Sequence, residues 1–310
     1  MTKIKVIGVG GSGSNTVSRM TSCKIQGVDL IAVNTDLQDL KKTKANLKIQ
    51  IGKNLTKGLG AGMNPEIGKK AVEEQSKNIE EVLRGTDMVF ITGGFGGGTC
   101  TGAAPVIAEI AKSLGVLTVA IVTKPFGFEG VPRMKIAKEG LENLKSKVDT
   151  LVVIPNDKLL SLVDENTTLL SAFWLADDVL RQAVQGISDL ILVPGIINID
   201  FADVKTILEN SGRATFGCGK AKGSKRMAEA VNLAINSPLV DFSIRGAKGV
   251  LFNVYGGDDL SLTEIDEAAK IITKNIEPQA KVIFGAVKDS KLKKGEVKIM
   301  VIATGFLTST

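Results

Sequence analysis

The stretch that decides the fold is "GGFGGGTCTG", residues 93–102, which places six glycines in ten positions directly after the apolar run "DMVFIT" at 87–92. Glycine loses more backbone entropy on folding than any other residue, so this run indicates a turn whose backbone must stay unhindered. A second glycine-rich turn, "GVGGSGSN" at 8–15, follows the first apolar run of the chain. Two such turns at the ends of two strands predict one ligand that both turns approach.

The first half of the chain alternates apolar runs with amphipathic stretches. We expect strands at 3–9, 29–35, 47–52, 87–92, 117–123 and 150–155. These runs are continuously apolar, which is typical of parallel strands that are covered on both faces. Helices are expected between them at 65–84, 101–114 and 133–147. The pattern predicts an α/β domain with a doubly wound, mostly parallel sheet, whose ligands bind at the carboxyl ends of the strands.

A long helix and a second domain are expected to follow. The segment 167–191 has apolar residues at spacings of three and four, which predicts a helix that Pro194 and Gly195 end. Beyond it we expect strands at 213–219, 248–256, 281–287 and 297–305. Helices are expected near 224–236 and 263–276, the last with a capping box from Thr263 to Asp266. The predicted division is a ligand-binding domain over 1–166, a connecting helix over 167–193 and a smaller α+β C-terminal domain over 194–310.

Composition narrows the classes of protein. The chain has 310 residues, of which 44% are apolar and 23% charged, and no apolar run approaches the roughly 20 residues that span a bilayer. The N-terminus has no signal-peptide pattern, and three separated cysteines form no C-x-x-C, so we expect a cytosolic protein without disulfides or zinc. The absence of histidine removes the commonest general base and the commonest transition-metal ligand.

The formal charge of +6 raises the question of nucleic acid. Lysine clusters occur at 41–44, 220–226 and 291–294, but aromatic residues make up only 4% of the chain and none interleaves with these clusters. Stacking platforms for bases are therefore scarce. We interpret the clusters as solvated lysine faces and expect no nucleic-acid partner.

The first glycine turn fits a dinucleotide fingerprint, because Gly8, Gly10 and Gly13 follow a strand and Asp36 lies about twenty residues on. That motif alone permits a nicotinamide or flavin enzyme, or a tight turn without a ligand. The second run adds another row of backbone N–H groups that opens onto a helix, and two such cradles fit a polyphosphate better. Neither run is followed by G-K-[ST], so the lysine that binds phosphate in P-loop proteins is missing. We therefore expect backbone dipoles and Mg²⁺ to balance the phosphate charge.

At this point the chain resembles a known family. "GGGTCTG" looks like the tubulin signature loop, and "GLGAGMNPEIG", "TKPFGFEG", "IPNDKLL", "ADDVLRQAVQGISDLI" and "NIDFADVKTI" look like segments of the FtsZ cell-division GTPases, in the same order. The resemblance covers essentially the whole chain. It implies a tubulin/FtsZ-like fold, binding of GTP and GDP, head-to-tail homopolymers and a cytoplasmic location at the division site.

The resemblance also implies site residues. Asn156 and Asp178 would bind the guanine edge, with Phe173 stacked on the base. The other residues implied at the nucleotide lie in its loops and on the ribose side: Gly10, Gly11, Gly13, Asn15, Gly62, Asn64, Gly96, Gly97, Gly98, Thr99, Thr101, Thr123, Pro125, Glu129 and Arg133.

For hydrolysis, the resemblance implies that Asn198, Asp200 and Asp203 enter the nucleotide pocket of the next subunit, where the two carboxylates orient water and help to hold the cation. Both aspartates also suit the start of a helix, where acids favour the positive end of the dipole. We expect Asp200 to be the cap and Asp203 the chemical group. A heterologous contact of this kind forms open filaments.

Three hypotheses about the function remain. The first is a GTPase that is active on polymerisation; the second is a GTP-binding, filament-forming homologue with little or no hydrolysis. Cys100 bears on this choice, because it stands where the signature loop has glycine and would strain a positive φ. The third is a nicotinamide oxidoreductase, which would lack a histidine proton donor. Membrane-tethering division proteins bind the family through a C-terminal tail peptide that this chain lacks, so we expect a trimmed chain or another route to the membrane.

Overall fold

The structure is a computed structural model that describes residues 2–25, 27–162, 167–237 and 244–306. The chain divides into two compact units, Met1–Gln185 and Gly186–Thr310. This boundary lies inside the long helix α9 (Leu169–Leu192). The expected boundary at residue 166 lies outside the described residues, and the expected three-part division stays a prediction.

The first unit contains a parallel sheet in the order β3-β2-β1-β4-β5-β6. The chain reverses direction across the sheet between β1 and β4, and ligands of doubly wound folds bind at such a switch point. The strands are β1 (Ile4–Val9), β2 (Val28–Asn34), β3 (Leu47–Gln50), β4 (Met88–Gly94), β5 (Leu117–Lys124) and β6 (Thr150–Pro155).

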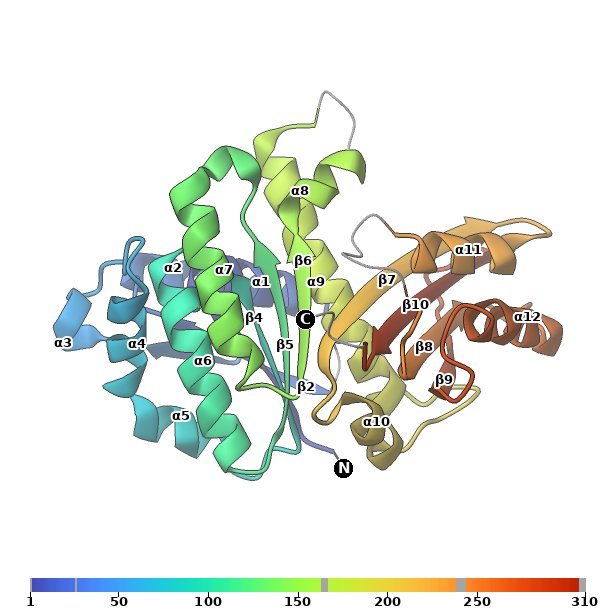
Figure 1. Ribbon diagram of the computed structural model, residues 1–310, viewed down its shortest axis with the longest axis horizontal. Helices are drawn as coiled ribbons and strands as arrows, with labels where there is room; N and C mark the ends of the chain where they lie inside the picture. The colour runs from blue at the N-terminus through green and yellow to red at the C-terminus, as the bar shows by residue number, and fades with distance from the viewer. Residues whose placement is uncertain (1, 26, 163–166, 238–243, 307–310) are drawn as a thin grey trace. The chain divides into compact units, whose positions relative to one another are not determined.

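Helices cover both faces of this sheet. In Figure 1, α6 and α7 lie in front of β4 and β5, and α1 lies behind them. Inward residues of the two strands, such as Val89 and Ala120, pack in one buried cluster with Ile107 of α6 and Leu141 of α7. The helices are α1 (Gly10–Ser22), α2 (Leu37–Lys42), α3 (Lys53–Thr56), α4 (Pro65–Glu73), α5 (Ser76–Leu83), α6 (Gly98–Ser113), α7 (Val131–Lys145) and α8 (Asn156–Leu159), with 3₁₀ turns η1 (Gly127–Glu129) and η2 (Leu160–Leu162).

In the second unit the strands pair in the order β7-β10-β8-β9. β10 is antiparallel to both β7 and β8, and β8 is parallel to β9. The elements are α10 (Phe201–Leu208), β7 (Gly212–Lys222), α11 (Arg226–Ile235), β8 (Gly249–Gly256), α12 (Leu262–Thr273), β9 (Lys281–Lys288) and β10 (Glu296–Thr304). This is the smaller α+β unit that the sequence predicts.

Three local predictions are wrong. The helix expected at 65–84 is two helices, α4 and α5, which Glu74 and Gln75 separate. The helix expected from 101 begins at Gly98, inside the glycine run. The capping box of α12 joins Ser261 to Glu264 rather than Thr263 to Asp266, because the helix begins at Leu262 and the Ser261 hydroxyl accepts a hydrogen bond from Glu264 N.

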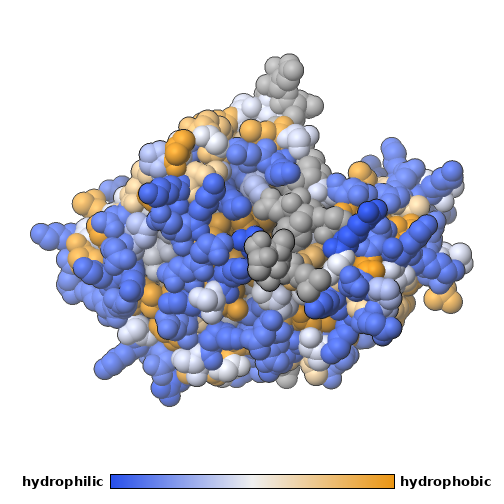
Figure 2. Space-filling model, viewed as in Figure 1, coloured by the Kyte–Doolittle hydropathy of each residue, from blue (hydrophilic) through white to orange (hydrophobic). Residues whose placement is uncertain are grey.

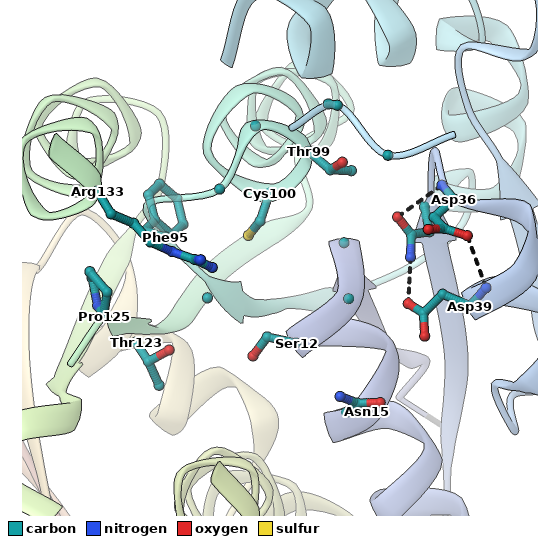
Figure 3. A pocket seen from close by; sticks show the side chains of 18 of the residues that line it. Ser12, Asn15, Asp36, Asp39, Phe95, Thr99, Cys100, Thr123, Pro125 and Arg133 are labelled. Atoms are coloured by element: carbon teal, nitrogen blue, oxygen red, sulfur yellow. Dashed lines mark hydrogen bonds between the residues drawn. The ribbon is translucent and has the colours of Figure 1, made fainter. Parts of the chain in front are cut away.

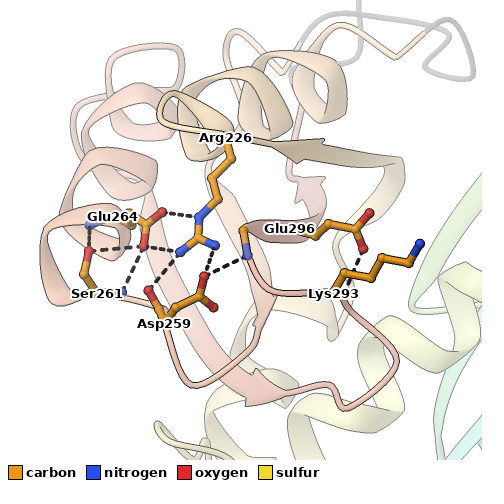
Figure 4. A network of polar contacts seen from close by, with 7 residues as sticks. Arg226, Asp259, Ser261, Glu264, Lys293 and Glu296 are labelled. Carbon is orange, nitrogen blue, oxygen red and sulfur yellow. Dashed lines mark hydrogen bonds and ion pairs between the residues drawn. The ribbon is translucent and has the colours of Figure 1, made fainter.

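A buried ion network orders the second unit (Figure 4). The Arg226 side chain is only 7% exposed, and it donates to both carboxylate oxygens of Glu264, to the Asp259 carboxylate and to the Asp259 carbonyl. Asp259 Oδ2 also accepts from Gly295 N at 2.9 Å. The network therefore joins the start of α11, the start of α12 and the turn before β10.

Hydrophilic side chains dominate the face seen in Figure 2, with hydrophobic ones in scattered groups. Within the described ranges, no helix is both long enough and apolar enough to cross a bilayer.

Candidate functional site

A cavity of about 590 Å³ opens at the carboxyl ends of the strands of the first unit, and we call it the first cavity. Its lining comes from the turns after β1 and β4, from Asn34 at the end of β2, from Thr123 of β5 and from Asn156 after β6. Figure 3 shows Arg133 and Pro125 at one end, Ser12 and Thr99 in the middle and Asp36 and Asp39 at the other end. The glycine-rich turns thus converge on one space.

Two helices point their N-termini into the first cavity. Gly10 and Gly11 at the start of α1 and Gly98 and Thr99 at the start of α6 all line it. Neither helix has a side-chain hydrogen bond at its N-cap, a property that they share with α3, α5, α7, α8 and α11. What distinguishes α1 and α6 is that both N-termini line the same cavity. The first N–H groups of a helix lack intrahelical acceptors and carry the positive end of its dipole. The cavity is therefore suited to an anion.

Glycine is needed where backbones approach each other. Gly10 has φ +72°, which L side chains rarely adopt. A Cβ on Gly98 would lie 2.8 Å from the carbonyl oxygen of Gly62, to which Gly98 N donates a hydrogen bond of 2.6 Å. Gly97 differs, because a Cβ there would meet no atom within 4 Å. Gly97 therefore leaves open space beside the anion site.

Cys100 lies in α6 with a negative φ, so its Cβ brings no backbone strain. Its side chain is 4% exposed, and burial raises the pKa of the thiol to about 12. The sulfur would lie 2.6 Å from a Cβ built on Gly93, which shows that it fills space beneath the turn. Cys100 is a neutral packing group at neutral pH.

Most nucleotide residues implied by the resemblance line the first cavity. They are Gly10, Gly11, Asn15, Gly62, Gly97, Gly98, Thr99, Thr123, Pro125, Glu129, Arg133, Asn156 and Phe173.

Five others do not line it. A Cβ on Gly13 would lie 2.6 Å from the backbone carbon of Gly8, so Gly13 lets α1 pack against β1. Gly96 N donates to Thr101 Oγ1 at 2.9 Å, and this bond braces the turn from within. Asn64 caps α4 by accepting from Glu66 N. The fifth residue is Asp178.

Asp178 points to other partners. Its carboxylate accepts from Arg181 Nε and Gln182 Nε2, each at 2.7 Å. Burial opposes ionisation, but these bonds outweigh burial and leave the pKa of Asp178 lowered. Asp177 lines the cavity in its place. The helical period predicts this exchange, because Asp177 lies four residues after Phe173 and shares its face, whereas Asp178 is rotated a further 100° or so.

The Asp177 carboxyl is 9% exposed and accepts a hydrogen bond of 3.1 Å from the Thr16 hydroxyl. Burial raises the pKa of Asp177 to about 6, although the Thr16 bond and the charge of Arg19 act against this rise. Asn156 is 5% exposed, and its Oδ1 has no hydrogen-bond partner among the described residues. A desolvated carboxyl and an unpaired amide oxygen thus line the same cavity.

Residues beyond the predicted set complete the two ends. Asp36 caps α2, because its Oδ1 accepts hydrogen bonds from Gln38 N and Asp39 N. This capping role accounts for Asp36 without the ribose contact that the oxidoreductase hypothesis requires. Burial and the charge of Asp36 raise the pKa of Asp39, which accepts from Asn34 Nδ2 at 2.7 Å. At the other end Arg133 Nε lies 3.1 Å from Glu129 Oε2.

The three predicted hydrolytic residues lie in the second unit. Asp200 is the N-cap of α10 and accepts from Ala202 N, as expected, and Asp203 lies in the first turn of that helix. Asn198 Oδ1 accepts from Gly195 N at 2.6 Å and so braces the preceding turn.

The protein residues do not form a metal cage by themselves. Over the described parts of the chain, no three Asp, Glu, Cys or His side chains lie close enough together to hold an ion. Mg²⁺ needs only one or two protein ligands when phosphate oxygens and water supply the rest. Four acids line the cavity, namely Asp36, Asp39, Glu129 and Asp177. One oxygen of Asp36 and one of Asp39 accept hydrogen bonds from within the chain.

The chain matches known protein families over most of its length. Residues 3–164 match the model of the Tubulin/FtsZ family, GTPase domain, and residues 212–307 match that of the FtsZ family, C-terminal domain. The chain is similar to an empty FtsZ dimer from M. jannaschii, with 50% identity and a TM-score of 0.94 over 98% of this chain and 88% of that one. An FtsZ W319Y mutant from the same organism gives 50% identity and 0.95, over 98% and 91%.

A more distant structure shares the fold. It is CetZ1 from Haloferax volcanii as a GDP-bound monomer, with 21% identity and a TM-score of 0.83 over 99% of this chain and 95% of that one.

Proposed function

Because the chain belongs to the tubulin/FtsZ family, we propose that it binds GTP in the first cavity, polymerises head to tail and hydrolyses GTP at the junction between subunits. The observation that carries this proposal is that two helix N-termini, both without a side-chain cap, open into one cavity. Backbone N–H groups and two helix dipoles then meet the phosphates, which accounts for a phosphate site without a Walker lysine.

The base end favours guanine. An ionised Asp177 can accept from N1–H and the N2 amino group of guanine, which adenine does not present in that arrangement. The unpaired Asn156 Oδ1 offers a second acceptor, and Phe173, which is 39% exposed, offers a ring face. A buried acceptor that is left unpaired costs about 1–3 kcal/mol, so adenine nucleotides should bind less well. We therefore move the base-reading role from Asp178 to Asp177.

Mg²⁺ would enter with the triphosphate and neutralise part of its charge. The phosphates and water would supply most of its ligands, and the backbone cradle would hold the phosphates against it. The protein's own task is to position the γ-phosphate and to exclude water except at the point of attack.

The chain has no histidine, and the carboxylates of Asp36 and Asp39 in the first cavity each accept hydrogen bonds within their own segment, so we take the hydrolytic group from elsewhere. We assign that group to Asp203 of the next subunit, with Asp200 holding the start of α10 and Asn198 bracing the turn before it. Asp203 is exposed and follows a fixed cap, and so it is presented on a rigid helix end. The dimer formed by the M. jannaschii FtsZ supports self-association as the setting for this contact.

The test is the release of phosphate from GTP as a function of protein concentration. A junction site predicts that release per subunit rises with polymerisation and then levels off, and that Asp203→Ala lowers the plateau by about 100-fold or more while GTP binding is retained. Glu209→Gln, at the other end of α10, is the matched control and should keep the plateau. A release rate that does not depend on concentration would contradict the shared site, and polymer without release would support the non-hydrolysing alternative.

A further inference from the structure

A second cavity of about 590 Å³ lies in the first unit beside the first one. Ser18 and Arg19 of α1 contribute to it, together with Lys42 and Lys44 at the end of α2 and just beyond it, and Trp174 near the start of α9. Asn15, Phe173 and Asp177 line both cavities. The second cavity therefore adjoins the base-reading end of the first, and its volume lies in the range of small-molecule sites.

Three cationic side chains line the second cavity, against one acid, Asp177. Arg19 Nε is buried and has no hydrogen-bond partner among the described residues. Lys42 and Lys44 form no ion pair with any residue in the described ranges. Arg19 acts electrostatically on Asp177 and Asp178, and Lys42 on Asp39, but no carboxylate forms a salt bridge with them. The cavity thus carries an excess of positive charge.

Hydrogen bonds place the backbone of Lys44 against the helix that carries Arg19. Lys44 N donates to Ser18 Oγ, and the Thr21 hydroxyl donates to Lys44 O, each at 3.0 Å. These bonds tie the segment after α2 to α1, so Lys44 and Arg19 are held on facing elements. A cation that is held in place before binding loses less entropy when it meets an anion.

An aromatic platform completes the second cavity. Trp174 is the only tryptophan of the chain and is 57% exposed, and the Arg19 guanidinium carbon lies 4.0 Å from its ring centroid. The guanidinium lies over one face of the ring, and the exposed fraction of Trp174 leaves indole surface on which a second flat group can stack. Leu170, which is 80% exposed, adds an apolar edge. Cations beside an exposed indole are the combination that binds a base together with its phosphate.

We propose that the second cavity binds a purine nucleotide in addition to the one in the first cavity. Its base stacks on Trp174, and its phosphate is bound by Lys42, Lys44 and Arg19. The two cavities differ in chemistry, because backbone dipoles hold phosphate in the first and side-chain charges hold it in the second. Asp177 lines both cavities, but Asn156 lines only the first, so the second cavity lacks the pair of base-reading groups and accepts adenine and guanine nucleotides alike.

Trp174 reports directly on this site, because no other tryptophan emits. The full chain, with and without saturating GDP, is titrated with AMP, with adenosine and with inorganic pyrophosphate. AMP should quench the emission saturably under both conditions, and adenosine should bind about tenfold more weakly because it lacks the phosphate. Pyrophosphate should compete with AMP. The GDP arm separates this proposal from GTP binding in the first cavity, since either can fail alone.

Variants test each part of the site. The double variant Lys42→Ala/Lys44→Ala should weaken AMP about tenfold. Lys41→Ala/Lys48→Ala removes two neighbouring exposed lysines that do not line the cavity, and it should leave the affinity unchanged. Trp174→Ala should weaken AMP about tenfold when binding is measured with radiolabelled AMP, whereas Trp174→Phe keeps a stacking ring and should restore most of the affinity.

Several outcomes would overturn the proposal. One is equal affinity for AMP and adenosine, and another is equal loss in the two lysine double variants. A third is emission that changes with protein concentration but not with AMP, which would make this surface an interface between copies of the chain. Absence of saturable quenching by AMP, together with no retention of the radiolabel, would also refute it.

Discussion

The Arg226 network and the first cavity handle buried polar groups in opposite ways. Every nitrogen of the Arg226 guanidinium donates to Asp259 or Glu264 (Figure 4). In the first cavity Asn156 Oδ1 is buried and unpaired, and the Asp177 carboxyl is desolvated with one hydrogen bond from Thr16. Buried polar groups are almost always satisfied in folded proteins. The hydrogen-bonding groups of Arg226 are therefore satisfied within the protein, whereas Asn156 Oδ1 in the cavity can take a hydrogen bond from a ligand.

The difference also appears in the ionisation of the acids. The hydrogen bond from Arg226 is the main cause that lowers the pKa of Glu264, whereas burial raises the pKa of Asp177. A lowered pKa means that the folded state stabilises the charge, and a raised one means that the folded state opposes it. Ionised Glu264 thus stabilises the folded protein, whereas Asp177 is an acid whose charge a hydrogen-bond donor of a ligand would stabilise.

The largest effect is expected from Arg226→Ala, which would leave the Glu264 carboxylate without its main partner. We expect the free energy of unfolding to fall by about 3 kcal/mol at pH 7, measured by urea denaturation. The pKa of Glu264 is lowered from 4.5 on folding, so its contribution is present above that value and is lost as the pH falls below it. Lys270→Ala breaks an exposed pair on α12 and should cost at most about 0.5 kcal/mol. Equal losses of unfolding free energy in the two variants would show that the Arg226 network stabilises the protein no more than an exposed ion pair does.

Substitutions at two glycines distinguish an effect on helix packing from an effect on ligand binding. A Cβ on Gly102 would clash with the Pro65 carbonyl oxygen where α6 meets α4, so Gly102→Ala should destabilise the protein by about 2 kcal/mol. Gly97→Ala meets no atom within 4 Å and should keep the stability within about 0.5 kcal/mol, yet its methyl group would narrow the space for phosphate. We expect weaker GTP binding in calorimetry for Gly97→Ala. The reverse pattern would show that Gly97 has a packing role.

Asp177→Asn tests whether the buried Asp177 carboxylate lowers the stability of the protein. Because folding raises the pKa of Asp177 from 3.8 to about 6, stability falls as the pH rises from about 4 to about 6 and stays lower at higher pH. The amide variant should therefore be more stable than the parent by about 2–3 kcal/mol at pH 7, and the gap should close as the pH falls toward 4.

The same residue predicts a pH dependence of binding. Protonated Asp177 cannot accept both guanine donors, so the affinity for GDP should fall below pH 6, whereas Asp177→Asn should bind more weakly at pH 7 and show little change with pH. Asp178→Asn is the matched control and should retain the parent's pH profile. A profile that followed Asp178 instead would return the base-reading role to that residue.

The smallest effect is expected at Cys100. Cys100→Ala keeps the helical backbone of α6, and GTP turnover should stay within about twofold of the parent. Burial and the raised pKa should also protect the Cys100 thiol from iodoacetamide, while exposed Cys23 reacts, as mass spectrometry of the alkylated chain would show. Rapid alkylation of Cys100 would mean that the cavity opens more widely than the structure shows.

The sequence predicts the sheet well because its strands are continuous apolar runs between glycine turns, and all six strands expected in the first unit begin within one residue of the observed start. It fails at the break between α4 and α5 and at the capping box of α12, because a local pattern permits neighbouring registers and packing chooses between them.

The site was predicted in outline rather than in detail. Two glycine turns after strands suffice to place a shared anion cavity, because parallel strands end on one edge of the sheet. Motif matching cannot tell a glycine that faces the ligand, such as Gly97, from one that admits a helix, such as Gly13. The resemblance implies Asp178 as the base reader, whereas we propose Asp177, which lies four residues after Phe173 and lines the cavity.

The two helix N-termini of the first cavity have a consequence for covalent modification. Arg133 is the only cation among the described residues that line this cavity, and it lies at one end of it. Acetylation or carbamylation of lysines would therefore leave the phosphate cradle chemically intact, since peptide N–H groups carry no removable charge. The same reagents would neutralise Lys42 and Lys44, so metabolic acylation would act on one cavity and spare its neighbour.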